Sequence, residues 1–413
     1  MQADVVVLGA GMIGVSIALH LQKRGKSVVL MDRRQPAEEA SYGNGGVVHR
    51  EGVFPYTFPR EVSEILRVAG NREVDAVYHS SALPSLMRPL LSYWWHSAPA
   101  RYDPITRDYA PLIAACLEEH KKLAEEAGTA DMLRPVGYLR AHSKQHALDA
   151  ELEKAEKAKR YFGVNYAALD PAGIRQAEPH LNGPFLGAVH WVDSHAVNDP
   201  QALALSYVAL FQRLGGVFVT GDAGSLARQG AGWRVTAADG TAIEAEHAVV
   251  ALGIWSDRVT SRFGYAPPLF GKRGYHLHYH WQGNAFLTRP VVTDSFLLAP
   301  MRAGLRLTTG AEFAPADAPP TPVQLRRAEP IARGFLPIGE TIEPTPWMGV
   351  RPCLPDMKPV IGAAPGQKGL WLAFGHAHHG FTLGPITGRL IAEMISGEPT
   401  CLDATPFRPE RFR

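Results

Sequence analysis

"DVVVLGAGMIGVSIALHLQKRGKSVVLMD", residues 4–32, is the stretch that decides the fold of this protein. Residues 4–8 form a short valine-rich apolar run, which is typical of a strand buried on both faces of a parallel sheet. Residues 15–25 have helical spacing and end in Lys-Arg before a glycine, a common helix C-terminus. Residues 27–32 form a second apolar run. The order strand, glycine turn, helix, strand predicts a βαβ unit.

The turn inside this unit carries three glycines spaced as GxGxxG. Gly9 permits the tight turn, Gly11 lets the backbone approach a pyrophosphate, and Gly14 lets the helix lie close to the strand. The helix N-terminus offers unpaired N–H groups and a partial positive charge to phosphates. Asp32 ends the second strand, where a carboxylate accepts hydrogen bonds from ribose hydroxyls. Because an acid at this place disfavours a phosphorylated ribose, the pattern predicts a site for FAD or NAD rather than NADP.

Two further glycine-rich segments distinguish between these cofactors. "ASYGNGGVVHR" (40–50) follows the ribose-binding strand and can run along a long cofactor to its ring system. "GLWLAFGHAHHGFTLGPITGRLIAEMISG" (369–397) has the pattern strand, glycine loop, helix, and it can meet the same ring from the other end of the chain. A nicotinamide enzyme does not need the first of these loops, so the sequence predicts a flavin.

Length and composition limit the classes of function. The chain has 413 residues, enough for two domains, and its net charge is +2 with Lys and Arg scattered, so no nucleic-acid-binding face is expected. Cys116, Cys353 and Cys401 lie far apart without CxxC pairing, which indicates a reducing compartment. No apolar run reaches the roughly 18 residues of a spanning helix. We expect a cytoplasmic protein; peripheral association with the inner membrane and homo-oligomerisation stay open.

The remaining segments indicate an interrupted architecture. Residues 60–165 are helix-rich, residues 265–345 alternate between polar and apolar as in antiparallel strands, and the pattern strand, glycine loop, helix returns from 347 onward. We expect an α/β fold with an α+β substrate part, in which a discontinuous Rossmann-like FAD-binding domain joins a mixed-sheet substrate-binding domain. The expected FAD-binding segments are 1–60, 185–264 and 346–413, and the expected substrate-binding segments are 61–184 and 265–345.

Several segments resemble the D-amino acid oxidase superfamily of flavoproteins, and within it most closely the bacterial D-amino acid dehydrogenases. The matching pieces, in the family's order, are "VVVLGAGMIG", "ASYGNGG", "HAVVALGIWSD", "GKRGYHL", "WMGVRPCLPDMKPVIG" and "GLWLAFGHAHHGFTLGPITGRLIAEMISG". The resemblance implies FAD-dependent oxidative deamination of D-amino acids to 2-oxo acids and ammonia, with a hydride passing from the substrate Cα to flavin N5. It implies two partners, an amino acid substrate and an electron acceptor such as a quinone, an electron-transfer chain or oxygen.

Five residues follow from this resemblance as candidates around the substrate. Arg351 matches the family's carboxylate-binding arginine, whose planar fork suits two carboxylate oxygens. Tyr275 matches a position lining the substrate site, where its hydroxyl can bond the carboxylate or the amine. His49, just past the glycine loop, and His379 are candidates for shaping the pocket or contacting substrate. Lys272 stands either near flavin N5, where a lysine favours reaction of the reduced flavin with oxygen, or in solvent before a strand.

The expected FAD contacts come from the glycine segments and from two further motifs. The resemblance implies that the main chain of Val219 reads the adenine and that the helix after residues 375–380, with Pro385 in its first turn, points its N-terminus at the flavin pyrimidine edge. Some relatives tether the flavin through a cysteine two residues before the arginine position; Gly349 stands there, so we expect non-covalent FAD. The full expected set is Gly9, Gly11, Met12, Ile13, Gly14, Asp32, Arg33, Ser41, Asn44, Gly45, Gly46, Val219, Gly253, Trp255, Gly375, His378, Gly380, Phe381 and Thr382.

The histidines of "GHAHHG" raise the alternative of a metal site, because His376, His378 and His379 fall within four positions. No carboxylate or cysteine stands beside them in the sequence, so we expect no metal. We expect these histidines to line the pocket, with His378 or His379 contacting substrate.

Three alternatives to D-amino acid oxidation stay open. A secondary-amine dehydrogenase or oxidase would act on cis-4-hydroxy-D-proline, D-proline, sarcosine or glycine, and the polar residues His49, Tyr275, His378 and His379 would suit a hydroxylated ring. An FAD-binding subunit of a hetero-oligomeric amine dehydrogenase would use the charged helices at 110–160 as a docking face. A nicotinamide dehydrogenase would be colourless.

Overall fold

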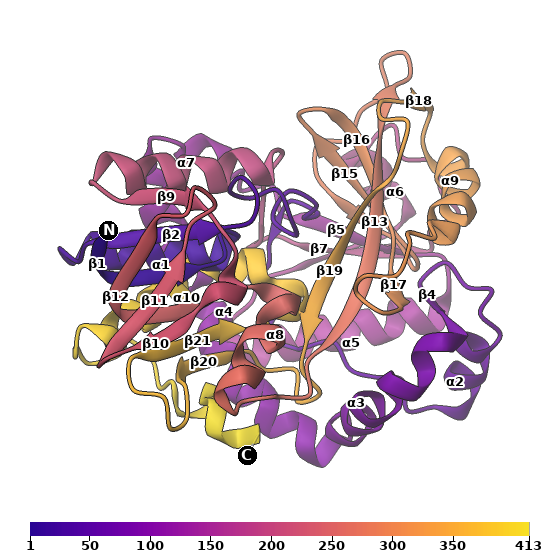
Figure 1. The fold of residues 1–413 in the computed structure, drawn as a ribbon. Helices are drawn as coiled ribbons and strands as arrows, with labels where there is room; N and C mark the ends of the chain where they lie inside the picture. The colour runs from indigo at the N-terminus through magenta and orange to yellow at the C-terminus, as the bar shows by residue number, and fades with distance from the viewer. Residues whose placement is uncertain (413) are drawn as a thin grey trace.

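A computed structural model of the protein describes residues 1–412, which form two large β-sheets with helices around them (Figure 1). The first sheet has a parallel centre. In spatial order its parallel strands are β21 (Leu370–Phe374), β12 (Ala242–Val250), β1 (Gln2–Leu8), β2 (Val28–Asp32) and β9 (Val217–Thr220). β1 and β2 pair from Val5↔Val28 to Leu8↔Met31, as the βαβ pattern predicts. The antiparallel strands β10 (Ala227–Gln229), β11 (Gly232–Thr236) and β20 (Val360–Ala363) complete it.

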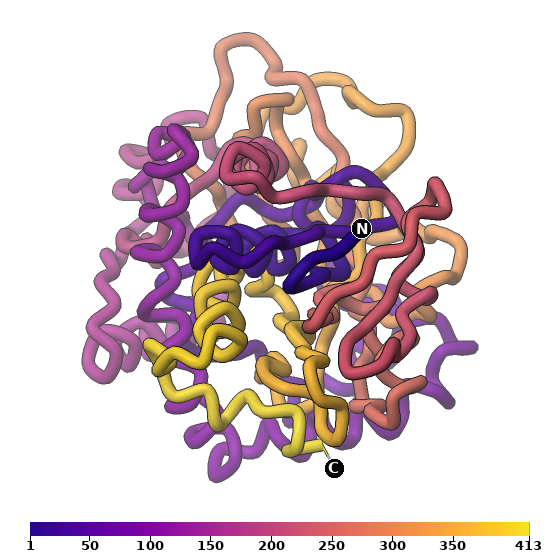
Figure 2. The backbone as a smooth tube through the Cα atoms, turned by 60° about the vertical axis from the view of Figure 1, so that its left-hand side comes forward, coloured from indigo at the N-terminus to yellow at the C-terminus, as the bar shows by residue number. Residues whose placement is uncertain are grey.

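Four helices pack together against the first sheet. They are α1 (Met12–Gln22), α4 (Pro99–Ala127), α7 (Pro200–Arg213) and α10 (Gly380–Ile395). Figure 2 shows the indigo helix α1 beside the yellow helix α10, although the two come from opposite ends of the chain. Helix α1 is apolar on nearly all sides because it lies between the sheet and α10, and a helix covered all round needs no polar face.

The second sheet is built around the long strand β13 (Phe270–Trp281). β13 pairs with four strands, β16 (Gly304–Thr308), β17 (Ala311–Phe313), β18 (Ile338–Thr341) and β19 (Trp347–Cys353). The sheet continues through β4 (Ala76–Tyr78), β15 (Leu297–Met301), β14 (Val291–Val292), β5 (Tyr138–His142), β7 (Gly187–Trp191) and β6 (Ala167–Leu169). The antiparallel pairing that the alternation over 265–345 predicts is therefore present.

The other elements are short or lie at the edges. They are β3 (Val47–Val48), β8 (His195–Ala196), α2 (Val62–Ala69), α3 (Leu83–His96), α5 (Gln145–Phe162), α6 (Pro171–Ala177), α8 (Ser256–Thr260), α9 (Val323–Phe335), and the 3₁₀ turns η3 (Ala223–Ser225), η4 (Gly253–Trp255) and η6 (Ala377–His379). No helix in the described part of the chain is long and apolar enough to cross a membrane.

Three elements pack differently from what the expected FAD-binding and substrate-binding segments predict. β7 falls in the expected FAD-binding segment 185–264 and β19 in 346–413, yet both pair in the second sheet. Helix α4 falls in an expected substrate-binding segment, yet it packs on α10 and α7 beside the first sheet. A short apolar run looks the same in either sheet, because its partners lie far away in sequence. The division into two domains stays a prediction.

Replacement of Gly14 by alanine is expected to destabilise this β1–α1 packing by about 3 kcal/mol and to weaken cofactor binding. An added Cβ at Gly14 would lie 1.7 Å from the carbonyl oxygen of Gly9, whose φ of 106° already requires glycine. Neither backbone can move without opening the turn. Urea unfolding of the variant and of Gly334→Ala checks this. Gly334 lies in α9, where a Cβ meets no atom within 4 Å, so that control should be neutral or slightly stabilising. Equal stability of the two variants would contradict the packing role.

Candidate active site

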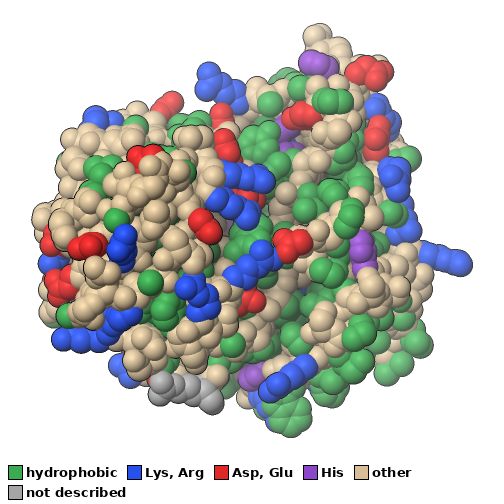
Figure 3. Space-filling view, in the orientation of Figure 1, with side chains coloured by type: hydrophobic (Ala, Val, Ile, Leu, Met, Phe, Trp, Pro, Cys, Tyr) green, Lys and Arg blue, Asp and Glu red, His purple; other side chains and the backbone are tan. Residues whose placement is uncertain are grey.

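A cavity of about 1030 Å³ is lined by residues of both sheets. Pockets for drug-sized ligands have volumes of roughly 300–1,000 Å³, so this cavity has room for an extended cofactor together with a small substrate. Figure 3 shows basic and acidic side chains gathered near the middle of the molecule, where the elements of the two sheets meet. The loops after β1, β2, β9 and β12 supply one end of the cavity, and β13 and β19 supply the other.

The first end has the features of a dinucleotide site. Gly11 precedes α1 without a side-chain cap, and a Cβ there would meet only the hydroxyl of Ser41 at 3.6 Å. The backbone N–H of Met12 donates to Ser41 Oγ at 2.9 Å. Asp32 lines the cavity and accepts from the Ala10 N–H at 2.7 Å; its burial raises the pKa of its carboxyl group. These features leave an open helix N-terminus and a fixed carboxylate side by side.

Two of the expected cofactor residues form a stacked pair at this end. The Arg33 guanidinium lies 4.0 Å above the Trp255 ring and donates to Glu39 at 2.7 Å. All three residues line the cavity, as does Gly253. A planar cation held on an indole presents a flat surface to a base or ribose.

The predicted adenine contact of the Val219 main chain stays a prediction. Val219 packs on the core beneath β9 and does not line the cavity, whereas the turn Gly221–Gly224 directly after the strand does. Ligands of a parallel sheet bind beyond the carboxyl ends of the strands, so the turn is the expected place for adenine contacts. The Gly-Asp sequence of this turn was the signal that could have found it.

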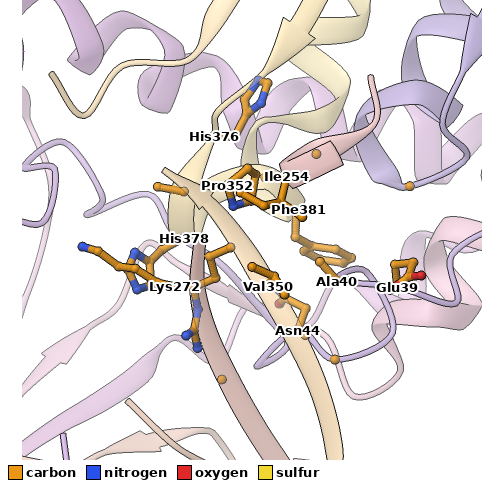
Figure 4. A pocket seen from close by; sticks show the side chains of 18 of the residues that line it. Glu39, Ala40, Asn44, Ile254, Lys272, Val350, Pro352, His376, His378 and Phe381 are labelled. Atoms are coloured by element: carbon orange, nitrogen blue, oxygen red, sulfur yellow. The ribbon is translucent and has the colours of Figure 1, made fainter. Parts of the chain in front are cut away.

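The loop over residues 375–380 sends its three histidines in different directions. His376 is buried, points away from Lys272 and His378 (Figure 4), and shares a hydrogen bond of 3.0 Å with Thr387 Oγ1. His378 lines the cavity with its ring 4.5 Å from that of Tyr56. His379 is buried outside the main cavity. Within residues 1–412 no group of three or more His, Cys, Asp or Glu residues is placed to hold a metal ion.

His379 therefore lies behind the cavity wall rather than in it. Its Nδ1 and the hydroxyl of Tyr109 are 2.8 Å apart, and its ring centroid lies 5.5 Å from that of His49. Burial lowers the pKa of His376 and of His379 to about 3 each, so both imidazoles are neutral near pH 7. The sequence places His379 in contact with substrate, and the structure instead gives it a supporting position.

Helix α10 starts directly at the cavity wall. Gly380 and Phe381 line the cavity, and no side chain caps this helix N-terminus. The expectation for Pro385 is wrong, because the helix begins at Gly380 and Pro385 is its sixth residue. Proline has no N–H to offer the carbonyl four residues earlier. His120 Nε2 bonds that carbonyl, Phe381 O, at 2.9 Å instead.

Two cations lie side by side at the second end of the cavity. Lys272 of β13 is paired in register with Arg351 of β19. Arg351 Nη1 donates to Gly310 O at 3.0 Å, and the guanidinium lies so close to Gly274 that a Cβ there would be 2.6 Å from Nη1. No carboxylate of the described residues lies within 4 Å of Arg351. Burial lowers the pKa of this guanidinium.

Lys272 is buried on the cavity wall rather than in solvent, so the surface alternative is wrong. Its Nζ donates to the Tyr93 hydroxyl at 3.0 Å and lies 4.3 Å from the centroid of that ring. Burial lowers the pKa of Lys272, but the neighbouring Tyr93 and Cys353 outweigh this and leave it raised. The second end of the cavity therefore carries two positive charges.

The hydroxyl of Tyr275 is fully occupied by protein groups. It donates to Glu312 at 2.6 Å and accepts from Arg273 at 2.7 Å and from the Thr321 N–H at 3.0 Å. Arg273 and Glu312 form a buried ion pair of 2.8 Å. Side chains alternate along a strand, so Tyr275 shares a face of β13 with Arg273 and not with Lys272. The ring borders the cavity, but the predicted hydroxyl contact to substrate is not supported.

His49 does line the cavity, as predicted. Its Nδ1 is 2.6 Å from Glu51 Oε1, and its backbone N–H donates to Thr382 Oγ1 at 3.1 Å. Thr382 is thus a support behind His49 and not a cavity residue.

The comparisons with known proteins agree with this geometry. The family model described as FAD dependent oxidoreductase (DAO) matches residues 4–394. The chain belongs to this family. It is 29% identical to a D-amino-acid oxidase of Bradyrhizobium diazoefficiens, over 99% of this chain and 98% of that protein. It is 28% identical to a D-amino acid dehydrogenase of Paramagnetospirillum magneticum, over 99% and 98%.

A glycine oxidase of Geobacillus kaustophilus has the same fold, with a TM-score of 0.76, 20% identity and 98% coverage of each chain. The resemblance to the D-amino acid oxidase superfamily and the α/β fold class are confirmed, and the enzyme is an FAD-dependent oxidoreductase. An oxidoreductase passes electrons from its substrate to an acceptor.

The residues that line the cavity of this flavoenzyme fit FAD. The open N-termini of α1 and α10 both reach the lining, as phosphates and a reduced flavin need. Of the expected FAD residues, those that line the cavity are Gly9, Gly11, Met12, Ile13, Asp32, Arg33, Ser41, Asn44, Gly45, Gly253, Trp255, His378, Gly380 and Phe381. Their roles as FAD contacts stay predictions.

Three expected glycines shape the flavoenzyme's loops from outside the lining. Gly14 allows the close helix–strand packing described above. Gly46 has φ 71°, and a Cβ there would lie 2.1 Å from Val197 O. Gly375 has φ 84°, and a Cβ would lie 2.4 Å from the Leu354 side chain. Each is needed for the backbone rather than for direct contact with a cofactor.

Sequence reasoning missed several residues that line the cavity of this oxidoreductase. Trp347 lies against Gly43 and Gly349, where a Cβ would be 1.8 Å and 2.1 Å from its ring. Arg140 of β5 lines the cavity, with its Nε 3.3 Å from Glu151 Oε2. The glycine at 349 was a usable signal for a bulky neighbour, whereas nothing in the local sequence marks Arg140.

Proposed function

We propose that the protein oxidises D-amino acids to 2-oxo acids and ammonia with non-covalently bound FAD. The observation that carries this proposal is Arg351, a buried guanidinium in the cavity wall whose hydrogen bond goes to a carbonyl and not to a carboxylate. A cation without a counter-charge in a buried site is costly, and a substrate carboxylate would relieve that cost with two parallel hydrogen bonds. The names of the two curated relatives agree with an amino acid substrate.

In this proposal the chain binds and orients, and the cofactor carries the redox chemistry. FAD, when bound, accepts the hydride from the substrate Cα. Gly11 and the N-terminus of α1 hold the pyrophosphate, and Asp32 accepts from the ribose. The N-terminus of α10 favours negative charge at the flavin edge. Arg351 would fix the substrate carboxylate in the cavity that His49 also lines.

The proposal includes an electron acceptor, and Lys272 bears on which acceptor is used. Lys272 is held beside Arg351, where it would lie near the reacting atoms and favour oxygen as an acceptor. A quinone or an electron-transfer chain is the other candidate. Peripheral membrane association, a cytoplasmic location and homo-oligomerisation stay predictions.

A substrate panel separates the proposed function from its alternatives. The purified protein is mixed anaerobically with D-amino acids, their L-enantiomers, sarcosine, glycine, D-proline and cis-4-hydroxy-D-proline, and loss of flavin absorbance near ~450 nm is followed. Reduction by primary D-amino acids supports the proposal. Reduction by cyclic or N-methylated amines alone would assign a secondary-amine enzyme. A yellow chain that no amine reduces would indicate a subunit of a larger amine dehydrogenase.

Denaturation of the purified protein is expected to release its FAD completely. Gly349 occupies the tethering position and its space is filled by Trp347, while Cys353 is buried on β19 with its Sγ 3.6 Å from Arg351 O. Filtration after acid or heat treatment should leave the flavin in the filtrate, and Cys353→Ala should give the same yield. Flavin fluorescence that stays with the denatured polypeptide would contradict the non-covalent assignment.

A further inference from the structure

Of the two histidines expected to be catalytic, His49 and His379, only His49 has a side chain bonded directly to a buried carboxylate. Nδ1 lies 2.6 Å from Glu51 Oε1, and 21% of the imidazole side chain is exposed, toward the cavity that His49 lines. Among residues 1–412, Nε2 forms no hydrogen bond with a protein group. With Nδ1–H donating to the carboxylate, Nε2 carries the free lone pair on the cavity side.

Glu51 is built to remain an anion. It is 5% exposed, and it accepts from Tyr138 at 2.8 Å and from Ser194 Oγ at 2.5 Å in addition to His49. Burial alone would raise the pKa of Glu51, but the charge of His49 and the hydrogen bonds from His49, Ser194 and Tyr138 outweigh it and hold the pKa far below the usual value. No lysine or arginine lies within 4 Å of this carboxylate in the described structure. His49 is therefore the one basic side chain hydrogen-bonded to this carboxylate among the described residues.

The charged or titratable groups around the imidazole and its partner are Glu51, Tyr138 of β5, Tyr56, His378 and His379 of η6, and Cys116 of α4, whose Sγ lies 3.9 Å from His49 O. Two guanidinium groups flank them: Arg50 acts on Cys116 and donates to Phe162 O, and Arg140 acts on Tyr138 and is paired with Glu151. Burial lowers the pKa of His379 to about 3, keeps His378 neutral, and raises the pKa of Cys116 and Tyr138, so all four are uncharged near pH 7. Glu51 is the charged group that is hydrogen-bonded to the ring itself.

We propose that His49 Nε2 accepts a proton from the substrate ammonium and that Glu51 is the positioning residue for this transfer. An amino acid enters as the zwitterion, and a hydride can leave its Cα only when the nitrogen is neutral. One N–H bond of the ammonium breaks, its electron pair stays on nitrogen, and the proton forms a new bond to Nε2. Glu51 fixes the tautomer with Nδ1 protonated and stabilises the imidazolium. Arg351, in the same cavity, would hold the substrate carboxylate.

Of the three other imidazoles near the cavity, none offers the same arrangement. His376 lines the cavity, but its Nε2 is bonded to the hydroxyl of Thr387 and it has no anionic partner, while His379 is bonded to Tyr109 outside the cavity. His378 reaches the cavity but lies beside the cations Arg351 and Lys272, which oppose its protonation. Only His49 combines cavity access with an anionic partner.

The inference rests on the proposed oxidation of amino acids, and its test is the pH dependence of flavin reduction. With a D-amino acid that reduces the parent enzyme, the second-order rate constant of reduction is measured by anaerobic stopped flow from pH 5.5 to 10.5. The parent should lose rate on the acid side as His49 becomes protonated. His49→Gln should fall about 100-fold at pH 7, lose that limb, and recover as the pH approaches the pKa of the free substrate amine. A purely structural role would lower the rate equally at every pH.

Glu51→Gln supplies the second variant. It keeps the size and the hydrogen-bond acceptor but removes the charge, so the acid limb should move to lower pH and the rate at pH 7 should fall about tenfold. Tyr109→Phe is the matched control, because it removes the partner of His379 and leaves His49–Glu51 intact; its acid limb should stay in place. Flavin spectra and urea midpoints of all variants show whether FAD and fold are retained.

The outcomes separate this inference from the function it rests on. If the parent oxidises D-amino acids but His49→Gln keeps the acid limb, or Glu51→Gln does not move it, the proton-transfer role is overturned and the proposed function stands. A shift of the limb in Tyr109→Phe would assign the role to His379 instead. If no amino acid reduces the parent, the proposed function itself fails.

Discussion

Replacement of Arg351 by methionine is expected to lower kcat/KM for D-amino acids about 10³-fold, a loss of about 4 kcal/mol of transition-state stabilisation. Methionine keeps much of the side-chain volume but offers no donor to the substrate carboxylate. The guanidinium lies flat against Gly274 with one Nη1 bond to Gly310, so its remaining N–H groups are free for a ligand. Steady-state rates with a dye acceptor, together with the visible spectrum of each variant, check the result.

Two further variants test the geometry of this arginine. Arg351→Lys keeps the charge but not the planar fork, and an intermediate loss of about 10- to 100-fold is expected. Gly274→Ala leaves Arg351 in the chain but places a Cβ 2.6 Å from Nη1, which should displace the guanidinium and raise KM more than it lowers kcat. A loss below tenfold in Arg351→Met, with FAD retained, would remove the observation on which the proposed function depends.

Acidification from pH 7 to pH 4.5 is expected to destabilise the folded protein by several kcal/mol. Burial lowers the pKa of His20, His376 and His379 to about 3 each and that of His120 to about 4. In the unfolded chain each imidazole titrates near 6.5. Below that pH the unfolded state binds more protons, so the stability present above pH 6.5 is lost as pH falls from 6.5 toward 4 and 3. Each histidine contributes up to about 1.4 kcal/mol per pH unit in that window.

Urea unfolding at half-unit pH steps measures this slope, and His20 supplies the control. His20 lies on α1, is 6% exposed, and has no hydrogen-bond partner for Nε2. His20→Leu should therefore fold. Between pH 6.5 and 4 its free energy of unfolding should fall less steeply than that of the parent, by up to about 1.4 kcal/mol per pH unit, the contribution of one histidine. A parent whose urea midpoint is unchanged between pH 7 and pH 5 would show that these imidazoles are not buried in the neutral form.

Much of the dinucleotide half could be predicted because its requirements are local. Gly9 is dictated by its φ of 106° and Gly14 by the close approach of β1 and α1, which lie within a few residues of one another. Asp32 follows from the end of the next strand. The turn Gly221–Gly224 was missed because a strand pattern does not by itself mark which residues follow its carboxyl end and line the cavity.

The histidine loop shows the opposite case. The spacing of His376, His378 and His379 is compatible with one shared metal site, but each ring contacts a different residue. His376 meets Thr387 and His379 meets Tyr109, which is 270 residues away in sequence. A one-dimensional pattern holds no information about such partners.

The same limit applies to Tyr275 and to the pair His49–Glu51. Tyr275 was a sound match to a substrate-site position, yet Glu312 and Thr321 occupy its hydroxyl. Glu51 stands two residues from His49 in the sequence. Its pKa, however, depends on its burial and on hydrogen bonds from the hydroxyls of Tyr138 and Ser194, which the sequence does not show. Only the packing around Glu51 lowers the pKa of its carboxyl group and places it beside the imidazole.

The sequence by itself determined the βαβ unit, the flavin-type cofactor and the choice of Arg351, which lines the cavity. These features depend on backbone conformation and on residue types within one segment, and both are written locally along the chain. Only the tertiary structure decided which polar side chains are free to meet a ligand and which are already bonded to protein. That choice depends on desolvation and on partners hundreds of residues apart, because a buried donor or acceptor must be satisfied by whatever the fold places beside it.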